Sequence, residues 1–248
     1  MNSLYLDIET IPCQRSDVRE FFAKKIAAGN VTKLAECKAP SNYKDPDKIA
    51  EYVEKAKRDI LNGEEAEIDA KLSETSFDGS FGQVLCIGLA WDNEPSRTYC
   101  ATDLSLEQER KVLQDFYCDV FDGPTRFRVV GHNVAAFDLR FLRQRSIVQG
   151  VQPPLSIPFD AKPWDDVIFD TMIQWSGLKA GGSMDKLCLA LGIPGKGDIS
   201  GADVWPMAQA GKFVEIAAYC RGDVERTRAI HKRMSFLSAD AVCELKAA

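Results

Sequence analysis

The sequence predicts an α/β fold with a mixed central β-sheet flanked by helices. Strand-like and helix-like segments alternate along the chain, and two of the strand-like segments are joined by a short turn, which gives the sheet antiparallel members. At 248 residues with 45% hydrophobic residues, the chain can bury a full core. The simplest organisation is therefore one domain covering residues 1–248.

The first half begins with a strand and continues with a charged insertion. The strand is expected at residues 3–8, in MNSLYLDIETIP. Residues 13–76 are charged and helical in pattern, and we interpret them as an insertion or lid. Within them Asp45-Pro46-Asp47 marks a helix start, and apolar residues recur at helical spacing (Ile49, Tyr52, Val53, Ala56 and Ile60). The hairpin follows, as GQVLCIGLAW and SRTYCAT joined by residues 92–95.

The second half continues the alternation. Ser105 and Gln108 form a capping box for a helix to about Val120, and a helix is also expected to begin near Val134. Strands are expected at 126–131 and 167–170, with a proline-rich loop at 153–166, and helices around 184–191, 203–210 and 212–236.

Charge and cysteine content exclude several classes of protein. The net charge of −6 argues against a broad basic surface, although residues 126–148 carry five arginines against one acid. No apolar stretch is long enough to cross a bilayer and no secretory signal is evident, so we expect a cytoplasmic protein. The eight cysteines include no CxxC, so neither a zinc site nor a redox pair is indicated, and Cys188 and Cys220 are expected to be buried free thiols.

Two carboxylates interrupt the first strand. Alternate residues of a strand face one way, so Asp7 and Glu9 lie about 7 Å apart on one face. Such a pair must be solvated or must hold a cation.

Two further carboxylates occupy positions next to apolar residues. Asp138, in GHNVAAFDLRFLRQ, borders the apolar face of the helix that this segment begins, with a turn-capping aspartate as the alternative. Asp223 lies in the apolar stripe of the last long helix, with Tyr219 one turn earlier on nearly the same face. A buried carboxylate needs a cation or hydrogen bonds, so Asp223 is either a metal ligand or a salt-bridge partner of an arginine.

Taken together, the four carboxylates predict a cage for hard divalent cations. Two ions about 3.5–4 Å apart activate a water and stabilise the leaving oxygen in phosphodiester cleavage. The apolar surroundings of Asp223 also predict that Asp223→Asn abolishes cleavage but leaves the metal-free fold as stable as wild type, or more stable.

Three ordered motifs resemble those of the DEDD superfamily of 3′-5′ exonucleases. They are Asp7-x-Glu9, Asn133-x-x-x-Phe137-Asp138 and Tyr219-x-x-x-Asp223. The spacing of Tyr219 matches the tyrosine branch, which includes the proofreading domains of family-B DNA polymerases; the histidine branch would have its histidine where Ala218 stands. The chain is similar to stand-alone bacterial proteins related to that proofreading domain, and residues 13–76 are the main segment outside the resemblance.

The resemblance implies a ribonuclease H-like fold and a 3′-5′ exonuclease that releases nucleoside 5′-monophosphates from single-stranded DNA. It implies that the four carboxylates bind two Mg²⁺ or Mn²⁺ ions and that Tyr219 orients the attacking water. Candidate nucleic-acid contacts are Thr10, Asn133, Phe137, Arg140, Arg143, Arg221 and Arg226. Core packing is the alternative for Phe137, and surface solvation is an equal alternative for each arginine. His132 is expected to be structural or adjacent to the substrate, with a general-base role second.

Two alternatives to this function remain open from the sequence. One is trimming of RNA, because the same branch includes RNA-trimming enzymes and a 2′-hydroxyl contact depends on one or two groups. The other is an inactive module that binds nucleic-acid ends. The expected partner is the 3′ end of a single strand, with DNA favoured over RNA and no membrane. The sequence names no protein partner.

Overall fold

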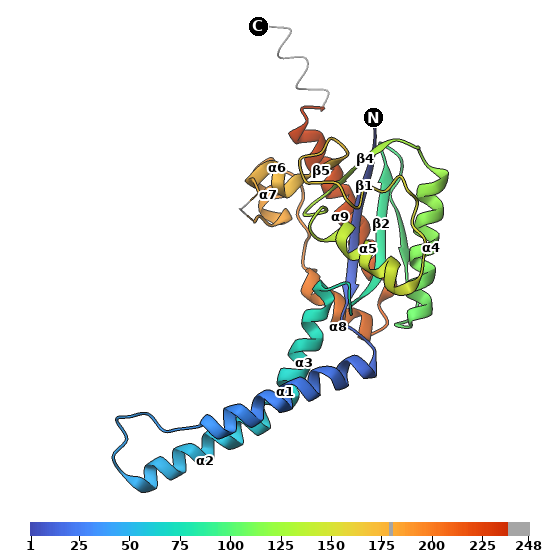
Figure 1. The fold of residues 1–248 in the computed structure, drawn as a ribbon. Coiled ribbons are helices and arrows are strands. Elements are labelled where there is room, and N and C mark those ends of the chain that lie inside the picture. Colours follow the sequence, from blue (N-terminus) through green and yellow to red (C-terminus); the bar gives the residue numbers. More distant parts are fainter. Residues whose placement is uncertain (179–180, 238–248) are drawn as a thin grey trace.

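Five strands form one mixed sheet in the order β3-β2-β1-β4-β5 (Figure 1). The structure is a computed structural model that describes residues 1–178 and 181–237. The strands are β1 (Asn2–Ile11), β2 (Gln83–Trp91), β3 (Arg97–Cys100), β4 (Phe127–Gly131) and β5 (Ile168–Asp170). The central strand β1 pairs antiparallel with β2 and parallel with β4. This confirms the predicted α/β fold with a mixed sheet, in the topology of a ribonuclease H-like domain.

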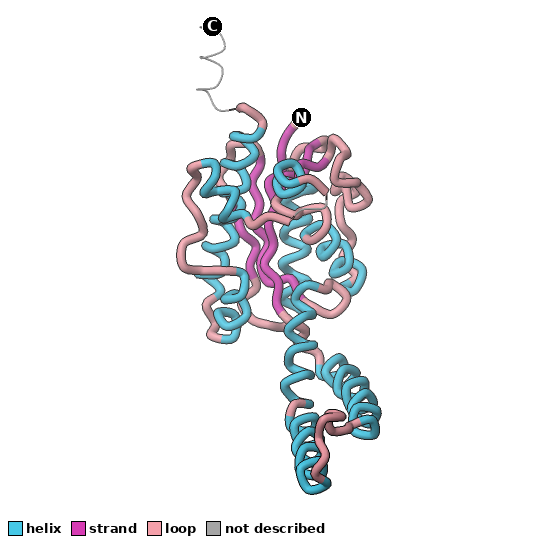
Figure 2. Tube along the Cα trace, turned by 90° about the vertical axis from the view of Figure 1, so that its left-hand side faces the viewer, coloured by secondary structure: helices cyan, strands magenta, loops and turns pink. Residues whose placement is uncertain are grey.

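Helices cover both faces of this sheet (Figure 2). The helices of residues 106–234 are α4 (Leu106–Asp122), α5 (Asp138–Gln149), α6 (Thr171–Ser176), α7 (Met184–Leu191), α8 (Val204–Gln209) and α9 (Phe213–Met234). Every residue of β2 is buried. At Gly88 of β2 an added Cβ would lie 2.8 Å from Val224 and 2.9 Å from Cys220, so α9 packs on the sheet at a distance that only glycine permits. This close packing brings α9 against β1, where the first two candidate carboxylates lie.

Most predicted helices are confirmed, and one start was wrong. The side chain of Ser105 caps α4 by accepting from the Gln108 amide, as the capping box predicted. The helix expected near Val134 begins instead at Asp138. Asn133 has a left-handed backbone with φ of 62°, and the Asp170 carboxylate accepts a hydrogen bond from its amide. These features keep residues 133–137 in a turn, so the helix starts only at Asp138. The short helix α6 was not predicted from the sequence.

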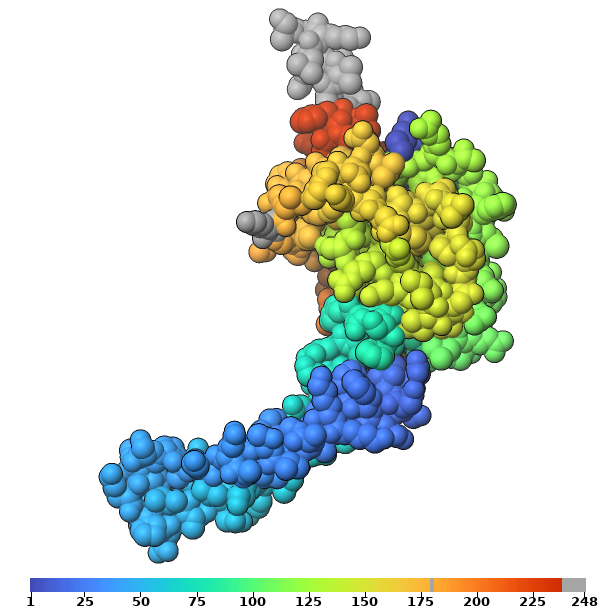
Figure 3. Space-filling view, in the orientation of Figure 1, coloured from blue at the N-terminus to red at the C-terminus, as the bar shows by residue number. Residues whose placement is uncertain are grey.

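The insertion forms a helical arm made of α1 (Ser16–Glu36), α2 (Pro46–Asn62) and α3 (Glu64–Glu74). Asp45 caps α2 as predicted, by accepting from the Asp47 amide. None of the residues of α2 is buried, so its apolar stripe is only partly covered. The arm extends away from the sheet (Figure 3) and does not cover it as a lid would. Within residues 1–178 and 181–237, no helix has the length and apolar character needed to cross a bilayer.

A buried ion pair joins α4 and α5 to β2. Arg145 of α5 donates to both carboxylate oxygens of Glu109 of α4, each at 2.7 Å, and the two side chains are 2% and 1% exposed. Glu109 also accepts from the amide of Val84, the second residue of β2, at 2.8 Å. The pair therefore fixes α4, α5 and β2 to one another.

We expect Arg145→Met to lower the free energy of unfolding by about 3–5 kcal/mol, because it leaves the Glu109 carboxylate buried without its cation. Urea unfolding measures this loss. The matched control is Lys111→Met, which breaks the exposed pair Lys111–Asp115 on α4, the helix that carries Glu109. This variant should lower the free energy of unfolding by less than about 1 kcal/mol. Equal losses in the two variants would show that the Glu109–Arg145 pair is not buried in solution.

Candidate active site

Asp7 and Glu9 lie on the face of β1 that packs against α9. Their carboxylate oxygens and the Cys220 sulfur lie within 4.8 Å of one another. Glu9 is buried and Asp7 is partly buried. The alternation of the strand thus places both acids on one face, as predicted, and α9 closes that face.

Asp138 joins this pair from the first turn of α5. It is buried, and its carboxylate accepts from the amide of Ile8, the residue between the first two acids, at 3.1 Å. The side chain therefore bonds to the backbone of β1, outside its own turn. Three of the four predicted carboxylates meet at this point of β1.

Asp223, on α9, is held by two cations. Lys196 donates to one oxygen at 2.6 Å, and Arg226 donates to the other, with its Nη2 at 2.8 Å and its Nε at 2.9 Å. The salt-bridge alternative drawn from the sequence thus describes the contacts of Asp223 in this structure. Lys196 also donates to the Tyr219 hydroxyl at 2.9 Å.

Lys196 is a site residue that the sequence analysis missed. It lies in the loop between α7 and α8, between Gly195 and Gly197, where no periodic pattern marks it. Gly197 has φ of 73°, in the left-handed region that favours glycine. A lysine flanked by glycines was the one available signal.

Burial and like charge raise the pKa values of the clustered acids. Burial, followed by the charge of Asp223, raises the pKa of Asp7 to about 8. Burial and the charge of Asp7 also raise the pKa of Glu9 and of Asp138 well above the usual range. These shifts agree with three carboxylates in one poorly solvated site, with the charge of Asp223 close to Asp7.

The two groups next to Asp223 keep their protons at neutral pH. Burial raises the pKa of the Tyr219 phenol, with the Lys196 contact acting in the opposite direction. Burial tends to lower the pKa of Lys196, but the attraction of Asp223 outweighs it and the net pKa is raised. Tyr219 is therefore a neutral hydroxyl, and Lys196 is a cation.

The donor set fits a hard divalent cation. Carboxylate oxygens are the ligands that Mg²⁺ and Mn²⁺ prefer, and Asp7, Glu9 and Asp138 bring repelling charges to one place. Cys220 is not a comparable ligand, because burial raises its pKa and its thiol lies 3.6 Å from the Asp7 carboxylate as a hydrogen-bond donor. Its buried thiol, like that of Cys188, is free as predicted, whereas Cys243 lies outside the described residues.

Three further candidates come from the segments that carry Glu9 and Asp138. The Thr10 hydroxyl donates to the Ser76 carbonyl at 2.6 Å, so its proton is already used within the protein. Asn133 is partly buried in the turn before α5. Phe137 is partly buried, and its ring centroid lies 5.7 Å from that of Phe141 in the core. One side of the Phe137 ring therefore packs against the core, as the alternative from the sequence had it.

The four candidate arginines fall into two groups. Arg140 and Arg221 are exposed. Arg143 is paired with Asp160 and Arg226 with Asp223, so neither is a free cation for a phosphate backbone. The prediction of strand contacts thus rests on Arg140 and Arg221.

His132 has a structural role. Its ring nitrogens lie 2.9 Å from the Thr171 hydroxyl and 2.9 Å from the Gly182 carbonyl, and burial lowers its pKa. Asp170, which the sequence analysis did not single out, accepts from the amides of Asn133 and Ala135 and caps α6. Asp170 therefore shapes the turn that precedes Asp138.

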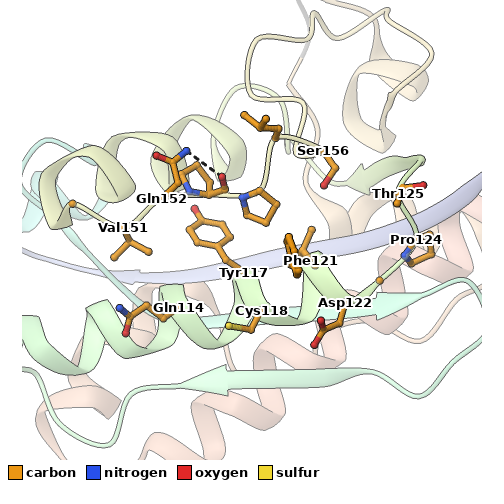
Figure 4. A pocket seen from close by; sticks show the side chains of 16 residues that line it. Gln114, Tyr117, Cys118, Phe121, Asp122, Pro124, Thr125, Val151, Gln152 and Ser156 are labelled. Atoms are coloured by element: carbon orange, nitrogen blue, oxygen red, sulfur yellow. Dashed lines mark hydrogen bonds between the residues drawn. The ribbon is translucent and has the colours of Figure 1, made fainter.

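A groove of about 840 Å³ lies elsewhere, between the end of α4 and residues 150–156 (Figure 4). Among the described residues that line it are Tyr117, Phe121 and Asp122, and none of the candidate site residues. One acid cannot form a two-ion cage, so this groove is not the candidate active site.

Comparison with known families identifies the chain. A model of predicted 3′-5′ exonucleases related to the exonuclease domain of PolB matches residues 80–244. The chain belongs to this family. It is accordingly an exonuclease, that is, a phosphodiester hydrolase of the 3′-5′ class. No curated protein matches the chain.

The family match begins after β1, so it includes Asp138, Tyr219 and Asp223 but not the first two acids. The sheet connects β1 to the matched part of the chain, because β1 lies between β2 and β4 and both of these strands are inside the matched range. The fold of this exonuclease therefore needs β1 at its centre.

Proposed function

We propose that the whole chain, 1–248, is one exonuclease domain of the tyrosine branch that shortens single-stranded DNA from its 3′ end and releases nucleoside 5′-monophosphates. Two Mg²⁺ or Mn²⁺ ions would be held by Asp7, Glu9, Asp138 and Asp223. The observation that carries the proposal is the cluster of Asp7 and Glu9 of β1 with Asp138 at the start of α5, whose pKa values are raised by burial and by one another, against the middle of α9.

The residues of the chain divide the work of hydrolysis. When bound, the divalent ions supply the positive charge that activates water and stabilises the leaving oxygen. Tyr219 is a poor general base because its phenol stays protonated. Its oxygen accepts from Lys196, which leaves its own O–H free to donate to the attacking water and so to orient it. Lys196 is a positioning residue that holds Tyr219 and Asp223 together.

An inactive end-binding module is disfavoured by the same cluster. Carboxylates with raised pKa values destabilise the fold at neutral pH relative to neutral side chains, and binding of a strand end gives no reason to gather them. No observation favours RNA over DNA, and both are therefore compared in the test.

We expect metal-dependent shortening of a single strand from its 3′ end. The purified chain is incubated with 5′-labelled and 3′-labelled single-stranded DNA and RNA in Mg²⁺, Mn²⁺ or excess chelator. The 5′-labelled DNA should give a descending ladder, and the 3′-labelled DNA should release labelled mononucleotide at once. Cuts in a circular single strand would contradict the exonuclease, full activity in chelator would contradict the metal, and faster decay of RNA would transfer the proposal to RNA.

A further inference from the structure

Phe77 exposes an aromatic ring beside the candidate active site. It is the last residue of the short 3-10 helix η1 (Thr75–Phe77), which connects the helical arm to the sheet, and it is 76% exposed. Its ring centroid lies 6.4 Å from that of Phe137, which in turn lies 5.7 Å from that of buried Phe141. The three rings form a row from the core to the surface.

The backbone of η1 is fixed by contacts next to the acids. The buried Thr75 accepts from the Cys13 amide at 2.8 Å, and the Ser76 carbonyl accepts from the Thr10 hydroxyl at 2.6 Å. Thr10 directly follows Glu9, and Phe137 directly precedes Asp138. Each ring of the pair is thus attached within a short distance of a different candidate metal ligand.

We propose that Phe77 and Phe137 form a stacking platform for a nucleobase near the 3′ end of the strand in the active site. This inference rests on the proposed function. Aromatic side chains stack on every base, because each base has a π-face, so such a platform holds a strand without reading its sequence. That property suits an enzyme that removes successive nucleotides of any sequence.

Phe77 differs in its location from other exposed aromatic residues of this chain. Phe121 is exposed to a similar degree, 79%, but it lies at the end of α4 and away from the acids. Phe77 also lies outside residues 80–244, the range that the family model matches. Phe77 is therefore contributed by the segment that joins the helical arm to the sheet, whereas Phe137 lies inside the matched range.

The test measures binding without cleavage. Anisotropy of 5′-fluorescein-labelled octathymidylate is recorded in excess chelator, for the intact strand and for strands with an abasic site at one of the last three nucleotides. For wild type, one of these abasic sites should weaken binding. Phe77→Ala should weaken binding of the intact strand by about 5- to 100-fold and abolish the penalty at that one site. Phe77→Trp should retain both properties, and Phe121→Ala should match wild type.

The outcomes separate this proposal from the proposed function. If wild type cleaves from the 3′ end and Phe77→Ala binds every strand as wild type does, the function stands and the platform is overturned. An equal loss for intact and for all abasic strands overturns stacking as the cause, as does a change of oligomeric state by sedimentation without a change of binding. If wild type neither cleaves nor binds, both proposals fail. Octauridylate provides the RNA arm, and stacking predicts the same loss with it.

Discussion

Asp223→Asn is expected to abolish cleavage and also to destabilise the chelated protein. The variant leaves Lys196 and Arg226 facing a neutral amide in place of a carboxylate whose side chain is 3% exposed. Hydrogen bonds to charged groups contribute about 1.5–3 kcal/mol each, and the two cations are 20% and 15% exposed, so we expect a net loss near that range. This reverses the expectation from the sequence, in which only apolar neighbours of Asp223 were visible.

A double variant identifies the cause of the loss. Lys196→Met combined with Asp223→Asn removes one of the two stranded cations, so the pair should cost less than the sum of the single variants. Urea unfolding in chelator gives the free energies of unfolding of wild type, the two single variants and the double variant, and single-stranded DNA decay in Mn²⁺ gives their activities. Additive losses would show that Lys196 does not interact with Asp223 in solution.

Sequence periodicity correctly predicted which site residues share a face when both residues lie in the same strand or the same helix. A strand repeats every two residues, so Asp7 and Glu9 had to share a face, and a helix places Tyr219 and Asp223 one turn apart. Both relations hold in the structure. The predicted succession of strands along the chain is also correct.

The remainder depends on contacts between residues far apart in the chain. Lys196 reaches Asp223 across 27 residues from a loop with no repeating pattern. Asp170 delays the start of α5 by binding the Asn133 amide 37 residues away, and local helix signals contain no trace of that bond. Local propensity and periodicity cannot encode such pairings.

Asp7→Asn is expected to abolish cleavage while leaving the chelated protein as stable as wild type, or more stable, at pH 8. Asp7 lies among acids and contacts the Cys220 thiol, and it has no direct cationic partner among the described residues. Its neighbour Asp223 takes both nearby cations. The activity loss should exceed the roughly 100-fold that loss of a ligand's supporting partner costs.

The pH dependence of stability gives this prediction its sign. The pKa of Asp7 rises from about 3.9 in an unfolded chain to about 8 in the fold. A raised pKa contributes stability that is fully present below the unfolded value and is lost as pH rises through the folded value. Chelated wild type should therefore lose stability between about pH 4 and pH 8, with a contribution from Asp7 of at most about 1.4 kcal/mol per pH unit. Asp7→Asn lacks that contribution, so its stability should fall less steeply. Glu107→Gln, which changes an exposed acid on α4, should keep the wild-type slope and activity. Parallel slopes for Asp7→Asn and wild type would mean that Asp7 is solvated and ionised in the chelated fold, and the crowded cluster of acids on β1 would then lose its electrostatic support.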